Sequence, residues 1–138
     1  MKKVLFLCTG NSARSIIAEC LLNQIGASRF SAHSAGSKPA GQVNPFTIKV
    51  LKNNNIKYRK ISSKNWDIFK NMNFNFVVTV CNNAANETCP VYPGSPTKIH
   101  WDIEDPAAYQ GNDVDKLDEF QRVFKKIEKF IKMEFINK

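Results

Sequence analysis

The chain has 138 residues, of which 43% are hydrophobic and 23% are charged, with a formal net charge of +8. The length suits one domain with its own core, here residues 1–138, and the composition excludes a disordered chain. No apolar window approaches the roughly 20 residues of a membrane-spanning helix, and the basic residues are scattered among acidic ones, unlike those of nucleic-acid-binding proteins. We therefore expect a cytoplasmic monomer with no membrane and no nucleic acid as partner.

Strand and helix patterns alternate along the chain. In order, we expect a strand at residues 4–7, a helix at 15–25, a strand at 29–34, a helix at 44–54, a short helix within 61–71, a strand at 74–80, a loop at 82–96, a strand at 98–101 and a helix at 114–135. Gly26 is a natural end for the first helix, and Pro45 suits the first turn of the second. The last helix carries the clearest apolar stripe, which runs from Val114 to Phe135.

This alternation predicts an α/β fold, a three-layer sandwich in which helices flank a central, mostly four-stranded parallel sheet. In such sheets, ligands bind at the edge where the strands have their carboxyl ends. Cys8 and Cys81 each follow a predicted strand directly. We therefore expect both thiols at the same edge of the sheet.

The four cysteines are Cys8, Cys20, Cys81 and Cys89. A core of this size does not need disulfides, and the spacing lacks the CxxC pairs of zinc sites, so we expect reduced thiols and no metal. Cys20 falls inside a predicted helix and is expected in the core. The two histidines, His33 and His100, are likewise expected to pack rather than to bind a ligand.

One loop carries the residues that indicate chemistry. Cys8 and Arg14, separated by five residues, lie between a predicted strand and a predicted helix. Amides of this loop are expected to surround an oxyanion at the positive helix end, and Arg14 is expected to hold two of its oxygens. The same positive groups lower the pKa of a thiol from about 8.5, which makes Cys8 a candidate thiolate nucleophile. The residues expected to bind the anion are Thr9, Gly10, Asn11, Ser12, Ala13 and Arg14.

Three residues of this region have expected supporting roles. Gly10 is expected to permit the tight turn of the loop. Ser15 is expected to donate a hydrogen bond to the Cys8 sulfur, and Asn11 to brace the loop through side-chain hydrogen bonds to backbone groups. A cysteine at a strand end beside a surface arginine is the purely structural alternative, and the strand before the loop and the helix after it favour the functional interpretation.

The loop sequence LCTGNSARS, with Ala18 and Glu19 beyond it, resembles the signature of the low-molecular-weight protein tyrosine phosphatase superfamily. Further segments are similar to those of its thioredoxin-coupled arsenate reductases, namely SAG at 34–36, VTVC at 78–81, CP at 89–90, HW at 100–101 and DP at 105–106. Together these motifs span nearly the whole chain. The resemblance implies a phosphatase-like fold and an enzyme that converts arsenate to arsenite.

The resemblance also selects a general acid, since a carboxylic acid that protonates the leaving oxygen assists its departure. Composition alone makes Asp102, Glu104 and Asp105 equal candidates. Asp105, which precedes Pro106, matches the Asp-Pro acid of the family.

Reduction of As(V) to As(III) requires two electrons, and the resemblance implies that thiols supply them. Cys8 would form a covalent arsenate adduct, and Cys81 would attack the Cys8 sulfur, which releases arsenite and leaves a Cys8–Cys81 disulfide. Cys89 would then attack Cys81, and thioredoxin would reduce the resulting disulfide, with no tightly bound cofactor. These relatives have one residue fewer between the last two cysteines, so glutaredoxin with glutathione is an alternative electron donor.

Some relatives bind potassium beside this loop, and Asn11, Glu19 and Ser34 match the positions involved. Lys64 stands where their fourth, acidic ligand would be. Its ammonium is expected to replace the ion, so the sequence predicts no metal requirement.

Two other functions use the same loop. A phosphatase acting on phosphotyrosine or small aryl phosphates fits because phosphate and arsenate share their geometry and charge. Such phosphatases usually have an aromatic residue after the Asp-Pro pair, where this chain has Ala107, and lack counterparts of Cys81 and Cys89. We therefore expect phosphatase activity only as a weak side reaction. A regulatory module that senses anions without turnover is disfavoured by the complete set of nucleophile, arginine and acid.

Overall fold

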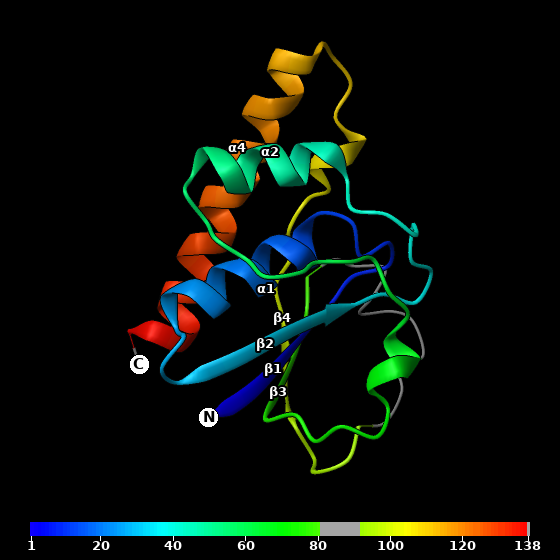
Figure 1. The fold of residues 1–138 in the computed structure, drawn as a ribbon, viewed down its shortest axis with the longest axis vertical. Helices are drawn as coiled ribbons and strands as arrows, with labels where there is room; N and C mark the ends of the chain where they lie inside the picture. Colours follow the sequence, from blue (N-terminus) through cyan, green and yellow to red (C-terminus); the bar gives the residue numbers. More distant parts are fainter. Residues whose placement is uncertain (81–91, 138) are drawn as a thin grey trace.

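The computed structural model describes residues 1–80 and 92–137. It contains the predicted parallel sheet, with strand order β2-β1-β3-β4 (Figure 1). The strands are β1 (Lys2–Leu7), β2 (Phe30–Ala35), β3 (Phe76–Thr79) and β4 (Thr97–His100). The described helices are α1 (Arg14–Ile25), α2 (Pro45–Asn53) and α4 (Asp113–Ile131), with the 3-10 turns η1 (Trp66–Phe69) and η2 (Pro106–Ala108) and the closing π-helical segment η3 (Lys132–Ile136).

The ends of the helices have local causes. Gly26 ends α1, as predicted. The side chain of Asn44 caps α2 by accepting the N–H of Phe46 at 2.9 Å, and Pro45 follows at a position that needs no N–H partner. At the start of α1, the cap residue Ala13 provides no side-chain hydrogen bond, and the first turn has no acidic residue. The positive end of α1 is therefore not neutralised by its own first turn.

The three layers of the molecule confirm the predicted sandwich. α1, α2 and α4 lie on one side of the sheet, where α1 packs against β1 and β2, and α4 packs against α1 and α2 (Figure 1). η1 and the residues near it close the opposite face. The larger core includes Phe6, Ile17, Leu21, Phe120 and Phe124, and the smaller one includes Leu5, Leu7, Trp66, Phe74 and Tyr92.

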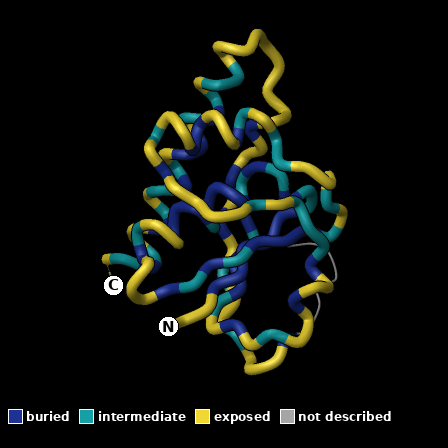
Figure 2. Tube along the Cα trace, in the orientation of Figure 1, coloured by how far each residue is buried: buried dark blue, intermediate teal, exposed yellow. Residues whose placement is uncertain are grey.

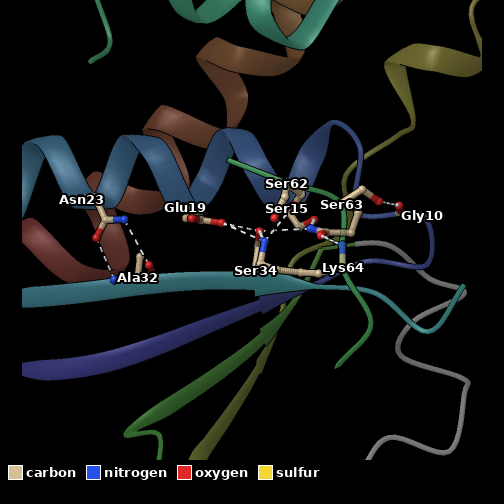
Figure 3. Close-up of polar contacts among 10 residues, drawn as sticks. Gly10, Ser15, Glu19, Asn23, Ala32, Ser34, Ser62, Ser63 and Lys64 are labelled. Carbon is tan, nitrogen blue, oxygen red and sulfur yellow. Dashed lines mark hydrogen bonds and ion pairs between the residues drawn. The ribbon is translucent and has the colours of Figure 1, made fainter. Parts of the chain in front are cut away.

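The outer edge of β2 is closed by groups from the same chain. The N–H of Phe30 donates to the Gly26 carbonyl at 2.8 Å. The Asn23 side chain accepts the N–H of Ala32 at 2.8 Å and donates to its carbonyl at 3.0 Å (Figure 3). These bonds take the place of a further strand beside β2.

Two predicted features differ in the structure. Val114 is 70% exposed, because the first turn of α4 extends beyond the core, where Figure 2 shows mostly exposed chain. The expected short helix within residues 61–71 is only the single turn η1, which Asn65 caps at the N–H of Asp67. The expected loop at 82–96 lies mostly outside the described residues. Among the described helices, none is long and apolar enough to cross a membrane.

Candidate active site

The Cys8 loop leaves the sheet at the carboxyl end of β1, as predicted. Cys8 is 4% exposed, and its N–H donates to a carbonyl of β2 at 3.2 Å. Leu7 lies opposite Thr79 in the register of β1 and β3, so the chain leaves β3 beside the Cys8 loop. The other two cysteines of the expected relay, Cys81 and Cys89, lie outside the described residues.

The carbonyl groups of the loop point to the surrounding scaffold. Those of Thr9, Gly10 and Ser12 accept hydrogen bonds at 2.9 to 3.0 Å from backbone N–H groups within residues 38–44. The Ser12 carbonyl also accepts the hydroxyl of the fully buried Thr47 at 2.8 Å. Outward carbonyls favour N–H groups on the concave side of a loop, which is the arrangement that binds an anion.

The chain bends at Gly10, and the next residue, Asn11, adopts the left-handed conformation of this loop. Asn11 has a φ of 45°, in the left-handed region that asparagine adopts more readily than most residues, whereas Gly10 lies outside that region. The expected turn therefore lies at Gly10, but its left-handed backbone conformation belongs to Asn11. Because the Asn11 side chain is fully buried and hydrogen-bonded, tertiary contacts hold this backbone conformation.

Asn11 joins the loop to its surroundings in three directions. Its Nδ2 donates to the Ser15 hydroxyl at 2.8 Å and to the Ser34 hydroxyl at 3.0 Å, and its Oδ1 accepts the N–H of Lys64 at 2.9 Å. The predicted bracing role is therefore partly met by hydroxyls rather than by backbone groups. Since the Ser15 oxygen accepts from Asn11, the Ser15 proton can be donated to another acceptor, as the expected bond to the Cys8 sulfur requires.

The carboxylate of Glu19 and the ammonium of Lys64 lie on either side of Ser34 in this network (Figure 3). Ser34 donates to Glu19, and Lys64 Nζ lies 3.8 Å from Glu19 Oε1 and 3.4 Å from the Ser34 hydroxyl. Lys64 Nζ also donates to the Ser62 carbonyl at 2.8 Å. The cluster thus already contains its own cation, so these residues do not fit a resident potassium ion.

Burial opposes the charge on both members of this pair. It raises the pKa of Glu19 and lowers the pKa of Lys64, against the opposing influence of the Ser34 hydrogen bond and of each partner's charge. Removing one partner of such a pair leaves the other buried without its counter-charge. The net contribution of the pair can therefore be small although each residue depends on the other.

Lys64→Met is expected to lower the free energy of unfolding by roughly 2 kcal/mol, because Glu19 loses its cation. The double variant Glu19→Gln, Lys64→Met should recover most of that loss. Since the folded-state pKa of Glu19 is raised, its contribution to stability is largest below its ordinary value of 4.5 and is lost as the pH rises, so the recovery should be larger at neutral than at acidic pH. Urea unfolding measures both variants, with the exposed Lys60→Met as control. If Lys64→Met is as stable as Lys60→Met, the prediction is contradicted.

Arg14 and Asp105 are brought together at this end of the sheet. Arg14 has a side chain that is 13% exposed, donates from Nη1 to the Ile103 carbonyl at 2.9 Å, and places Nη2 3.7 Å from Asp105 Oδ2. Asp105 accepts the N–H of Ala107 at 2.9 Å and so caps η2. Glu104, an equal candidate by composition, instead contacts α4. Of these two candidates, Asp105 is the one beside the arginine.

The remaining candidate ligands take structural positions. Cys20 is 1% exposed, and burial raises its pKa to about 12. His33 packs edge-on against two phenylalanine rings, and burial lowers its pKa. His100 Nδ1 lies 2.7 Å from the Thr79 hydroxyl. Within residues 1–80 and 92–137, no cluster of three or more His, Cys, Asp or Glu side chains is arranged to hold a metal.

Gly36 supports the loop in a way that the sequence did not predict. A Cβ atom at this position would lie 2.4 Å from the carbonyl oxygens of both Cys8 and Thr9. Only glycine allows the end of β2 to approach the loop this closely. The SAG motif includes this residue, but one sequence carries no signal that separates a packed glycine from an ordinary loop glycine.

Comparisons with known proteins agree with this geometry. Residues 3–135 match the family described as low molecular weight phosphotyrosine protein phosphatase. An arsenate reductase from Halalkalibacterium halodurans is 37% identical over 131 residues, which cover 95% of this chain and 93% of the relative. An arsenate reductase from Bacillus subtilis is 38% identical over 125 residues, which cover 88% of this chain and 86% of the relative.

Solved structures share the fold over nearly the whole chain. The crystal structure of an arsenate reductase from Archaeoglobus fulgidus aligns with a TM-score of 0.76 and 30% identity, covering 98% of this chain and 99% of that one. A thioredoxin-dependent arsenate reductase from Corynebacterium glutamicum aligns with a TM-score of 0.66 and 25% identity, covering 96% of this chain and 63% of that one. From its sequence, its fold and these relatives, the chain belongs to the low molecular weight phosphotyrosine protein phosphatase family.

Proposed function

We propose that this chain is an arsenate reductase that converts arsenate to arsenite with Cys8 as the nucleophile. The observation that carries the proposal is the placement of the buried Cys8 at the start of a loop that ends at the uncapped positive end of α1, with Arg14 and Asp105 beside each other. Relatives named arsenate reductase at 37% and 38% identity favour this substrate over a phosphate ester.

The first step is the formation of a covalent adduct. Arsenate oxygens accept hydrogen bonds from the loop amides and from the Arg14 N–H groups that Ile103 does not use. The Cys8 thiolate attacks arsenic, and an arsenic–oxygen bond breaks. Asp105 protonates the departing oxygen, which leaves as water.

The second step moves two electrons. The Cys81 thiolate attacks the Cys8 sulfur, and the electron pair of the sulfur–arsenic bond passes to arsenic, so that As(V) becomes As(III) and leaves as arsenite. Cys89 then attacks Cys81 and frees Cys8 as a thiolate. We propose thioredoxin as the reductant of the Cys81–Cys89 disulfide, supported by the thioredoxin-dependent relative, with glutaredoxin and glutathione as the alternative donor.

The protein needs no tightly bound cofactor under this proposal. Potassium is not required either, because Lys64 supplies the cation beside Glu19. Equal turnover in sodium and potassium salts at constant ionic strength is the expected result, and a specific potassium activation would contradict it. We also propose that residues 1–138 form a single domain that acts as a cytoplasmic monomer.

Cys81→Ser and Cys89→Ser are each expected to abolish multiple-turnover arsenate reduction and to spare the hydrolysis of p-nitrophenyl phosphate. Ester hydrolysis requires only Cys8, Arg14 and Asp105, whereas reduction requires the second and third thiols. An assay that couples arsenate, thioredoxin and thioredoxin reductase to NADPH oxidation measures the first activity, and nitrophenolate release measures the second.

The matched control is Cys20→Ser, which changes a thiol in the core and should keep both activities. Arsenate turnover that survives in both relay variants would show that the three-thiol mechanism is wrong. Replacing thioredoxin by glutaredoxin and glutathione identifies the donor. Ester hydrolysis without any arsenate reduction would favour the alternative function, a phosphatase acting on phosphotyrosine or small aryl phosphates.

A further inference from the structure

Residues 103–105, beside the Cys8 loop, contact Arg14, the larger core and α4. The Ile103 carbonyl accepts Arg14 Nη1 at 2.9 Å, and the Ile103 side chain is buried in the larger core. The Glu104 side chain contacts α4, and Asp105 is the candidate acid. The segment that carries the acid is therefore also the segment that orients the arginine.

Glu104 is bound by two cations of α4. Its Oε1 lies 2.6 Å from Arg122 Nη1, and its Oε2 lies 2.8 Å from Lys126 Nζ. Arg122 in turn donates from Nε and Nη2 to the two carboxylate oxygens of Glu119, each at 2.8 Å. Arg122 is thus fixed between two carboxylates and presents one edge of its guanidinium to Glu104.

These ion pairs are too exposed to matter much for stability. The Glu104 and Arg122 side chains are 41% and 52% exposed, and surface pairs contribute at most about 1 kcal/mol each. Hydrogen bonds, first from Lys126 and then from its own backbone and Arg122, lower the pKa of Glu104 to about 2. The carboxylate therefore stays charged over the whole pH range of an activity assay.

The effect of these ion pairs on the positions of Arg14 and Asp105 is expected to be more important than their effect on stability. A displacement of about 1 Å in a catalytic group can reduce a rate by about 10²-fold. Glu104 lies between the residue whose carbonyl binds Arg14 and the residue that carries the acid. A shift of its backbone moves both.

We propose that Glu104, Arg122 and Lys126 form a clamp that fixes residues 103–105 to α4 and thereby positions both Arg14 and Asp105. The three are positioning residues, because they act through the backbone of this segment and not on the substrate. The inference rests on the proposed roles of Arg14 and Asp105.

Glu104→Gln tests the clamp, with Glu128→Gln as its matched control. Glu128 also lies near two lysines, Lys125 and Lys132, but both of these pairs remain within α4 and η3. In Glu104→Gln, the arsenate concentration that protects Cys8 from iodoacetamide should rise about tenfold, because Arg14 is displaced. Hydrolysis of phenyl phosphate should fall more than hydrolysis of p-nitrophenyl phosphate, because the poorer leaving group depends more on the acid. Glu128→Gln should match the wild type in both measurements.

A purely structural role would leave both measurements unchanged, and that result would overturn the inference. The double variant Arg122→Met, Lys126→Met should reproduce the effects of Glu104→Gln, and adding Glu104→Gln to it should change little further. Additive effects would contradict a shared clamp.

A wild-type protein that neither binds arsenate nor hydrolyses esters would refute the proposed function instead. In that case, hydrogen exchange of the backbone amides in residues 102–108 tests the clamp independently of activity. Their exchange should be about tenfold faster in Glu104→Gln than in Glu128→Gln. Equal exchange in the two variants would overturn the clamp whatever the activity.

Discussion

Cys8→Ser is expected to reduce both arsenate turnover and ester hydrolysis by at least about 10⁴-fold. A thiol is a far better nucleophile than a serine hydroxyl, which stays protonated at neutral pH. Serine is close to cysteine in size, so the buried position of Cys8 should accept it and folding should be preserved. The NADPH-coupled assay and nitrophenolate release measure the loss, and calorimetric titration with arsenate should still detect binding.

The same substitution at Cys20 separates chemistry from packing. Cys20 is as buried as Cys8 but lies on the core side of α1, so Cys20→Ser should lower stability by about 1 kcal/mol and keep turnover. Turnover by Cys8→Ser comparable to that of Cys20→Ser would show that another group is the nucleophile.

Gly36→Ala is expected to destabilise the protein by about 3 kcal/mol and to reduce turnover by about 100-fold. The new methyl group would lie 2.4 Å from two backbone carbonyl oxygens of the Cys8 loop. The backbone cannot rotate away, because the N–H and carbonyl of Gly36 are each held at 2.9 Å, by Lys64 and Trp66 respectively. The strain must therefore move the loop. Urea unfolding and the initial rate of ester hydrolysis measure the two effects.

Gly26→Ala provides the comparison for this variant. Its nearest atoms, at 3.0 Å, are side-chain ends of Leu22 and Phe30, which are able to adjust, and a backbone carbonyl lies at 3.1 Å. This substitution at the end of α1 should cost some stability and leave the rate per folded molecule unchanged. If Gly36→Ala is as active as Gly26→Ala, the close approach of β2 does not shape the loop.

Local patterns were sufficient to predict most of the fold. Apolar runs indicated β1 and β3, and alternation indicated β2. Asn44 with Pro45 indicated the start of α2, because strands and helix caps depend on neighbouring residues. Val114 was assigned to the buried stripe although it is exposed. Its spacing fits the helix, but where the helix extends past the core is decided by the packing of other elements.

In the candidate site, too, some residues could be predicted from the local sequence and others could not. Cys8 and Arg14 were identified because one short segment contains both, whereas the place of Asp105 beside Arg14 followed only from the family resemblance. The roles of Gly36 and Glu104 depend on contacts with residues far away in the sequence, so no local pattern indicates them. The turn was expected at Gly10, where the chain does bend, but the sequence did not indicate that Asn11 adopts the left-handed conformation, held by two buried hydrogen bonds and one part-buried one.

The closed edge of β2 has a consequence for the protein at high concentration. An open outer strand offers peptide groups on which a second molecule can extend the sheet, which is the first step of many aggregation processes. Here the Asn23 amide occupies both peptide groups of Ala32, and Gly26 accepts the N–H of Phe30. A second molecule approaching this strand at Ala32 therefore meets a side chain in place of free backbone, which disfavours sheet growth at that point.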